Sequence, residues 1–172
     1  MTLFLTSSPS GCPFTPGPAI PVLDASNHFV ANLRAVWPDH PVLGLPGMFH
    51  NYHGIVLGVS AGSMNAARVV YAAPEEPGEA SDPSYCRWLN GLGLTETRIL
   101  PHYQFIRGNL LDGQKVEDIA LADSKKRPFL ALPDGSYIMC ADGHETLYGK
   151  AWYFVDGTME EINEDEDVLP LR

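Results

Sequence analysis

The pattern of apolar and polar positions predicts strands and helices in alternation over the first part of the chain. Residues 2–6 ("TLFLT") and 54–59 ("GIVLGV") are short apolar runs, and the second is typical of a strand buried on both faces. Residues 24–37 carry apolar side chains at a helical spacing behind candidate N-caps. Residues 7–22 are rich in Pro, Gly and Ser, which predicts a loop.

Helix formers follow the second apolar run and predict a helix over residues 63–73, which Pro74 ends. Residues 85–94 ("YCRWLNGLGL") favour a short helix that ends at a glycine. Residues 97–100 ("TRIL") favour a short strand, and residues 113–124 a further helix.

The pattern changes over residues 127–162, where short apolar segments alternate with Asp-Gly pairs at 134–135, 142–143 and 156–157. Asp-Gly between apolar runs is a strong signal for a turn between strands. The sequence therefore predicts one α/β domain, residues 1–172, with a β-rich C-terminal part.

Composition narrows the class of protein. With 45% hydrophobic residues the chain has enough apolar surface for a core, and no segment is apolar for long enough to span a bilayer. The formal net charge of −10 argues against binding to nucleic acid or to an anionic membrane. Much of the acidic excess lies in residues 159–172, which we expect to form a solvated tail.

Cysteine and histidine usage predicts neither a disulfide framework nor a metal site. Cys12, Cys86 and Cys140 lack C-x-x-C spacing, and His50 and His53 have no cluster of further ligands behind them. We therefore expect no metal and no cofactor, and a reducing cytoplasm as the location.

A serine motif lies between the buried run and the predicted helix. Gly58-Val59-Ser60-Ala61-Gly62 satisfies G-x-S-x-G in strand-to-helix context, where a nucleophilic serine sits on a tight turn. The N–H of Ala61, at the start of the helix, is a candidate oxyanion-hole donor. The alternative interpretation is that small residues here only let the helix pack closely on its strand.

A nucleophilic serine needs a base, and the base needs an acid that orients it. His102, just after the predicted strand 97–100, is the stronger candidate base, because His144 lies beside an Asp-Gly turn and is expected to be exposed. The pattern leaves the acid open among Glu75, Glu76, Glu79, Asp82, Asp112, Asp123 and Asp134.

At these residues the chain resembles a known family. "GVSAGSMN", "LPHYQ" and "ALPDGSYIM", in that order, are similar to the peptidase E family of serine peptidases, which are aspartyl dipeptidases with cyanophycinase as a relative. The segments 71–85 and 91–103 resemble a subgroup labelled peptidase E-like or type 1 glutamine amidotransferase-like. The resemblance implies a flavodoxin-like doubly wound sheet, related to class I glutamine amidotransferases.

The resemblance also implies roles for individual residues. Ser60 matches the nucleophile and His102 the base, and the family acid falls on Asp134, where the best-known members have glutamate. Glu76 is a candidate for binding the substrate α-amine. Arg107, five residues after His102, is the arginine nearest to the site in sequence, and thus the candidate for an acidic substrate side chain.

One departure from the family lies upstream of the serine. Members normally carry a further strand–helix unit there, and then a strand that ends in a glycine pair and completes the oxyanion hole. Here only residues 38–53 separate the first predicted helix from the strand at 54–59, and Gly44 or Gly47 would have to replace the missing donor.

Two hypotheses from different classes follow. The first is a serine-type, dipeptidase-like enzyme that hydrolyses small peptides through an acyl-enzyme on Ser60. The alternative is a catalytically impaired or inactive binding domain derived from the family, which lacks a complete oxyanion hole. A glutamine amidotransferase is disfavoured because the motif has no cysteine, and a homodimer could form through a sheet edge exposed by the shortened segment.

Overall fold

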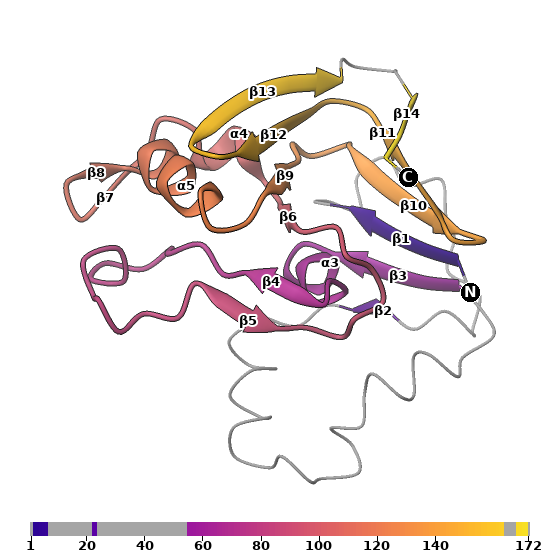
Figure 1. Ribbon diagram of the computed structural model, residues 1–172, viewed down its shortest axis with the longest axis horizontal. Coiled ribbons are helices and arrows are strands. Elements are labelled where there is room, and N and C mark those ends of the chain that lie inside the picture. Colours follow the sequence, from indigo (N-terminus) through magenta and orange to yellow (C-terminus); the bar gives the residue numbers. More distant parts are fainter. Residues whose placement is uncertain (1, 7–21, 24–54, 164–167, 172) are drawn as a thin grey trace, which may run out of the picture.

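The computed structural model describes residues 2–6, 22–23, 55–163 and 168–171, and Figure 1 draws the rest as a thin grey trace. The helix expected over residues 24–37 therefore lies outside the described residues, as do Gly44, Gly47 and nearly all of the loop expected over 7–22.

A six-stranded mixed sheet contains both strands that were predicted from apolar runs. Its order is β14-β11-β10-β1-β3-β2. The strands are β1 (Thr2–Thr6), β2 (Val22–Leu23), β3 (Ile55–Val59), β10 (Tyr137–Ala141), β11 (His144–Tyr148) and β14 (Val168–Pro170). Strand β3 runs parallel to β1 on one side and to β2 on the other, whereas β10, β11 and β14 each pair antiparallel with their neighbours.

A four-stranded sheet of order β13-β12-β9-β6 lies beside the first sheet (Figure 1). It consists of β6 (Ile99–Leu100), β9 (Phe129–Ala131), β12 (Ala151–Val155) and β13 (Thr158–Asn163), with β6 and β9 parallel. Two small antiparallel pairs complete the strands of the described residues: β4 (Val69–Tyr71) with β5 (Trp88–Asn90), and β7 (Leu110–Leu111) with β8 (Gln114–Lys115).

The predicted strand-rich C-terminal part is confirmed, and its Asp-Gly pairs form turns. The pair at 142–143 joins β10 to β11, and the pair at 156–157 joins β12 to β13. The pair at 134–135 does not form a hairpin, because it connects β9 in one sheet to β10 in the other.

The expected solvated tail is wrong over its described residues. The glutamates of β13 are exposed, but the strand pairs with β12, and β14 pairs with β11.

The helix expected over residues 63–73 is much shorter than predicted. Helix α3 covers Ala61–Asn65 only, and the chain then enters strand β4. The carbonyl oxygens of Asn65, Ala66 and Ala67, which a longer helix would use internally, accept hydrogen bonds from the N–H groups of residues 92–95. Contacts distant in sequence therefore replace the continuation of the helix.

The short helix expected over residues 85–94 is also wrong, because Trp88–Asn90 form β5. The residues after β5 run close against the end of α3. A Cβ at Gly91 would lie only 1.9 Å from the carbonyl oxygen of Ala67, so only glycine allows the two backbones to approach this closely. The helix expected over 113–124 is confirmed as α5 (Val116–Ser124), preceded by the β7–β8 hairpin.

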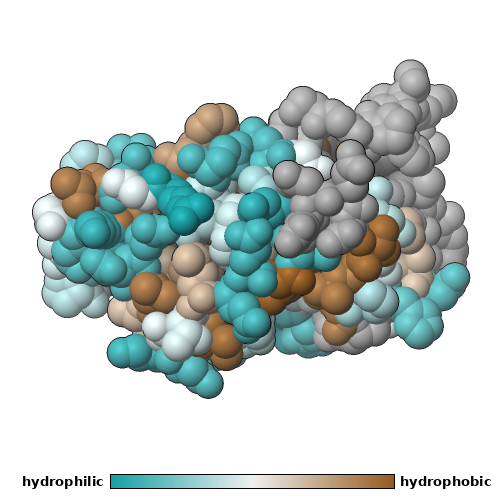
Figure 2. All heavy atoms as spheres, turned by 90° about the horizontal axis from the view of Figure 1, so that it is seen from above, coloured by the Kyte–Doolittle hydropathy of each residue, from teal (hydrophilic) through white to brown (hydrophobic). Residues whose placement is uncertain are grey.

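The core lies between the two sheets and the short helices. One cluster of buried side chains joins Val56 of β3 and Met64 of α3 to Ile138 and Leu147 of the larger sheet. A second cluster is aromatic: Phe129 stacks on Tyr71 at a centroid distance of 4.3 Å and on Phe154 at 5.0 Å. Figure 2 shows hydrophobic residues as small separate groups among hydrophilic ones on the face that it presents.

Candidate functional site

Ser60 occupies the tight turn between β3 and α3. Its backbone has φ 50° and ψ −125°, a conformation that residues other than glycine rarely adopt. The carbonyl oxygen of Ser60 accepts hydrogen bonds from the N–H groups of Ser63, at 2.9 Å, and Met64, at 3.3 Å. Such strain persists only where its surroundings enforce it, and it is a feature of a nucleophile on a strand-to-helix turn.

Gly58 allows α3 to fold back onto the end of β3. A Cβ at this position would lie 2.8 Å from Ser63 Cα, closer than real Cβ contacts come, and 3.1 Å from Ser63 N, which is a tight contact. The steric reason for glycine at the first position of the motif is thus present in the structure.

His102 follows β6 and begins helix α4 (Tyr103–Ile106). Its backbone is left-handed, with φ 59° and ψ 31°, which turns the side chain toward the serine. The next N–H, that of Tyr103, donates to Leu132 O at 3.1 Å and fixes the start of α4 to the end of β9. As a result, His102 Nε2 lies 2.8 Å from Ser60 Oγ.

Asp134 follows β9 and completes a chain of contacts. Its Oδ1 lies 2.7 Å from His102 Nδ1, and its backbone N–H donates to Gln104 Oε1 at 3.0 Å. The side chain of His102 is 36% exposed and that of Asp134 29%, so both are partly shielded from water. The sequence does not predict this role for Gln104, which is marked only by its place in the segment "LPHYQ".

Hydrogen-bonding capacity fixes the direction of these contacts. An ionised carboxylate only accepts, so the proton between Asp134 and His102 is on Nδ1. In the neutral imidazole Nε2 is then unprotonated and accepts a hydrogen bond from the hydroxyl of Ser60. The three residues follow the carboxyl ends of β3, β6 and β9, where sites in α/β folds gather.

A cleft with a volume of about 420 Å³ opens beside Ser60 and His102. That volume lies within the usual range for ligand pockets. Apolar side chains make up most of its wall: Ala61, Met64, Ala72, Ala73, Pro74, Leu100, Pro101, Ile106, Leu110, Leu111 and Val116. Glu75 and Asn109 are the polar residues that line it besides Ser60 and His102, among the residues that the structure describes.

Of the other predicted site residues, Ala61 lines the cleft, whereas Glu76 and Arg107 do not. Ala61 lines the cleft, and no acceptor for its N–H is found within the described part of the chain. Neither Glu76 nor Arg107 belongs to the cleft wall; Glu75, the neighbour of Glu76, does. Arg107 lies 3.5 Å from a Glu117 oxygen and stacks over Trp152. The expected roles of Glu76 and Arg107 thus have no support from their positions.

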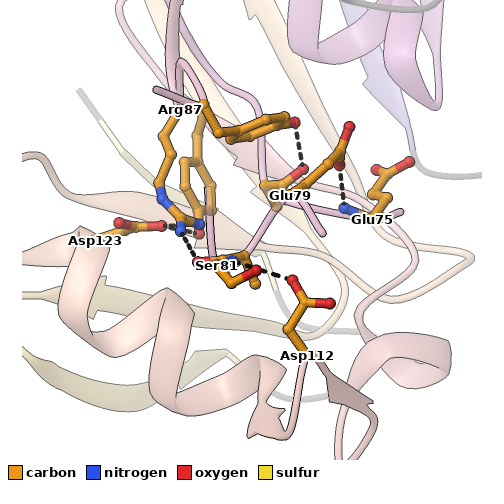
Figure 3. Close-up of polar contacts among 10 residues, drawn as sticks. Glu75, Glu79, Ser81, Arg87, Asp112 and Asp123 are labelled. Carbon is orange, nitrogen blue, oxygen red and sulfur yellow. Dashed lines mark hydrogen bonds and ion pairs between the residues drawn. The ribbon is translucent and has the colours of Figure 1, made fainter. Parts of the chain in front are cut away.

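The polar loop between β4 and β5, residues 72–87, is held by a network that Figure 3 shows. The Asp112 carboxylate accepts the N–H groups of Gly78, at 2.7 Å, and Ser81, at 3.0 Å. Arg87 bridges Asp123, at 3.3 Å, and Ala80 O, at 3.2 Å. Sequence reasoning treated Asp112 as a candidate acid, although its Asp-Gly pair signals the β7–β8 turn that carries it.

Burial perturbs two groups beside this network. Desolvation raises the pKa of Tyr71 above its usual range, and the neighbouring Asp123 carboxylate adds to the increase. Desolvation also raises the pKa of Asp123, although hydrogen bonds from Tyr71 and the charge of Arg87 oppose it. Neither Tyr71 nor Asp123 lines the cleft; the two side chains contact each other, and Asp123 binds Arg87 of the loop.

Comparisons with known proteins give the family of the chain and a similar fold. The model of a family described as Peptidase family S51 matches residues 50–148, more than half of the chain. A crystal structure of a peptidase from an acI-B1 Actinobacterium is similar, with a TM-score of 0.52 and 13% sequence identity, over 99% of this chain and 96% of that chain. At this identity the likeness concerns the fold alone. No curated protein matches the chain.

None of the helices in the described part of the chain has the length and apolar character that a membrane crossing requires.

Proposed function

Because the chain belongs to peptidase family S51, we propose that it is a serine-type, dipeptidase-like peptidase of the peptidase E type, with Ser60 as nucleophile. One observation carries the proposal: the unbroken chain of contacts from Ser60 Oγ to His102 Nε2 and from His102 Nδ1 to Asp134 Oδ1, at 2.8 and 2.7 Å. This is the arrangement of a Ser-His-Asp triad.

The proposed reaction proceeds in two halves. Ser60 Oγ attacks the carbonyl carbon of a small peptide while His102 Nε2 accepts its proton, and the imidazolium then gives that proton to the leaving amine. Water attacks the resulting acyl-enzyme while His102 Nε2 accepts a proton from it. The bond between the acyl carbon and Ser60 Oγ then breaks, the imidazolium returns the proton to Oγ, and the acid product leaves. Asp134 holds the Nδ1–H and stabilises the imidazolium in both halves. No cofactor or metal takes part.

The tetrahedral oxyanion needs hydrogen-bond donors. The Ala61 N–H is one proposed donor, since Ala61 directly follows the nucleophile and lines the cleft. A second donor at Gly44 or Gly47 would come from residues outside the described part. Removing one such donor typically costs roughly 10²–10³ in kcat.

We also propose a domain organisation, a location and a class of partners. We take the chain as one domain of flavodoxin-like doubly wound type that works on small peptides in the cytoplasm, not on nucleic acid or membranes, and that could form a homodimer. The acidic net charge of −10 supports the exclusion of anionic partners.

The test is covalent labelling with a fluorophosphonate probe, followed by mass spectrometry. The expected result is a mass increase on Ser60 and peptide hydrolysis that Ser60→Ala abolishes without loss of the folded state. Ser84→Ala is the matched control, because Ser84 is exposed, lies outside the cleft wall, and donates its hydroxyl to Asp82. A folded wild-type protein that neither labels nor hydrolyses peptides would instead support the inactive binding domain.

A further inference from the structure

The wall of the cleft beside Ser60 bears on which peptides can bind, and the argument rests on the proposed function. The segment from α4 to α5 contributes four aliphatic residues to the wall: Ile106 from α4, Leu110 and Leu111 from β7, and Val116 from α5. Leu110 is 69% exposed although it is aliphatic. A substrate side chain that covered these residues would remove apolar surface from water on both partners.

The described wall of the cleft has no positive charge that could bind an acidic side chain. Within the described residues its wall contains no lysine or arginine, and its one carboxylate is that of Glu75. Arg107, the arginine proposed from the sequence, pairs with Glu117, and Arg68 and Arg87 pair with Glu96 and Asp123. An acidic substrate side chain would enter an apolar cleft without a positive partner and with Glu75 nearby, which disfavours its charged form.

From this lining we infer that the peptidase takes peptides with an apolar side chain on the residue that supplies the scissile carbonyl, and that it discriminates against aspartate there. This specificity differs from the aspartyl preference that the family resemblance implies. We assign the cleft to the side chain of the acyl residue, which is the residue whose carbonyl carbon bonds to Ser60 Oγ. Ser60 and Ala61 themselves line the cleft, so the side chain of that residue lies beside its wall.

The size of the expected preference for Leu over Asp follows from the burial of the apolar side chain. Moving a leucine-sized side chain from water into an apolar site gains enough to raise kcat/KM roughly tenfold to a hundredfold when it is retained in the transition state. An aspartate of the same shape gains none of this and loses hydration. We therefore expect Leu to exceed Asp by at least about tenfold.

The experiment compares the dipeptides Leu-Ala, Asn-Ala and Asp-Ala by chromatographic assay of released alanine. The three acyl side chains share one branching pattern, so Asn separates the effect of polarity from that of charge. The expected order of kcat/KM is Leu, then Asn, then Asp. A preference for Asp-Ala would overturn the inference while leaving the proposed function intact, whereas no hydrolysis of any dipeptide would overturn both.

A charge substitution on the wall gives an independent check. Leu110→Arg should raise the ratio of Asp-Ala to Leu-Ala hydrolysis by about twofold to fivefold, which corresponds to an exposed ion pair. Leu110 is exposed, so the protein should fold with the new charge. Val168→Arg is the control: Val168 is an exposed aliphatic residue of β14, outside the cleft wall, and its substitution should leave the ratio unchanged. An unchanged ratio in Leu110→Arg would count against this wall as the acyl-side subsite.

Discussion

Replacing Gly58 with alanine tests whether the tight contact between β3 and α3 sets the position of Ser60. The added Cβ would lie 2.8 Å from Ser63 Cα, about 0.6 Å short of the 3.4 Å at which ordinary contact begins. The atoms that it meets belong to the backbone at the start of α3, so a side-chain rotation cannot relieve the clash. The helix must move away from the strand, and Ser60 lies between them.

Two effects of different size follow from this displacement. Overpacking of this kind typically lowers the free energy of unfolding by about 1–3 kcal/mol. Misplacing a reacting group by about 1 Å can cost roughly 10²-fold in rate, so a shift of about half that should slow the reaction of Ser60 by about tenfold or more. The loss of reactivity should therefore be larger than that caused by the loss of stability alone.

The assay measures both quantities on one protein sample. Urea unfolding gives the free energy of unfolding, and the second-order rate of fluorophosphonate labelling gives the reactivity of Ser60. Gly143→Ala is the matched control, because Gly143 has φ +81° in the β10–β11 turn and nothing lies within 4 Å of the added Cβ. That variant should lose about 1–2 kcal/mol from the left-handed backbone and label at the wild-type rate.

The result that refutes this reasoning is Gly58→Ala with wild-type labelling despite reduced stability. The contact between β3 and α3 would then stabilise the fold without setting the position of Ser60. Equal loss of labelling in Gly58→Ala and Gly143→Ala would likewise show that reactivity follows global stability.

Two further predictions concern carboxylates with different tasks. Asp134→Asn should reduce kcat/KM by roughly 10³–10⁴ with the fold intact, because an amide can donate to Nδ1 and so favours the wrong tautomer of His102; peptide hydrolysis within tenfold of wild type would argue against the triad. The N–H groups of Gly78 and Ser81 lower the pKa of Asp112, so its stabilisation of the loop is present above the unfolded value of 3.8 and disappears as the pH falls through the folded pKa. Asp112→Ala should therefore speed hydrogen exchange at those two amides at neutral pH but not at low pH, with Asp112→Asn intermediate; equal exchange at neutral pH would contradict the role assigned to the carboxylate.

The sequence indicated the site better than it indicated the elements around it. Ser60 could be found because its motif, a buried strand and small neighbours are all local features. His102 could be proposed because Pro101 and a short strand precede it. Asp134 could not be chosen by pattern among seven carboxylates, since what distinguishes it is the packing of β9 beside β6, a contact between segments far apart in the chain.

The two wrong helices have one physical cause. Residues 63–73 contain good helix formers, but Val69, Val70 and Tyr71 also favour a strand, and β4 pairs with the partner that β5 provides. That pairing, and the hydrogen bonds from residues 92–95 to the end of α3, depend on the close approach allowed by Gly91. Local propensity does not report such an approach, so the sequence pattern predicts helices where β4 and β5 pair with each other.

Because α3 is short, the proposed oxyanion hole receives less help from the helix dipole. A helix of only five residues aligns few peptide dipoles, so its macrodipole contributes less than the longer expected helix would. Stabilisation of an oxyanion must then come mainly from individual N–H groups held in fixed positions. Met64 and Ala66 are buried in the core, and the N–H groups of residues 92–95 donate to the carbonyls of residues 65–67, at and just after the end of α3. Tertiary packing rather than helix length therefore holds α3, and with it Ala61, in place.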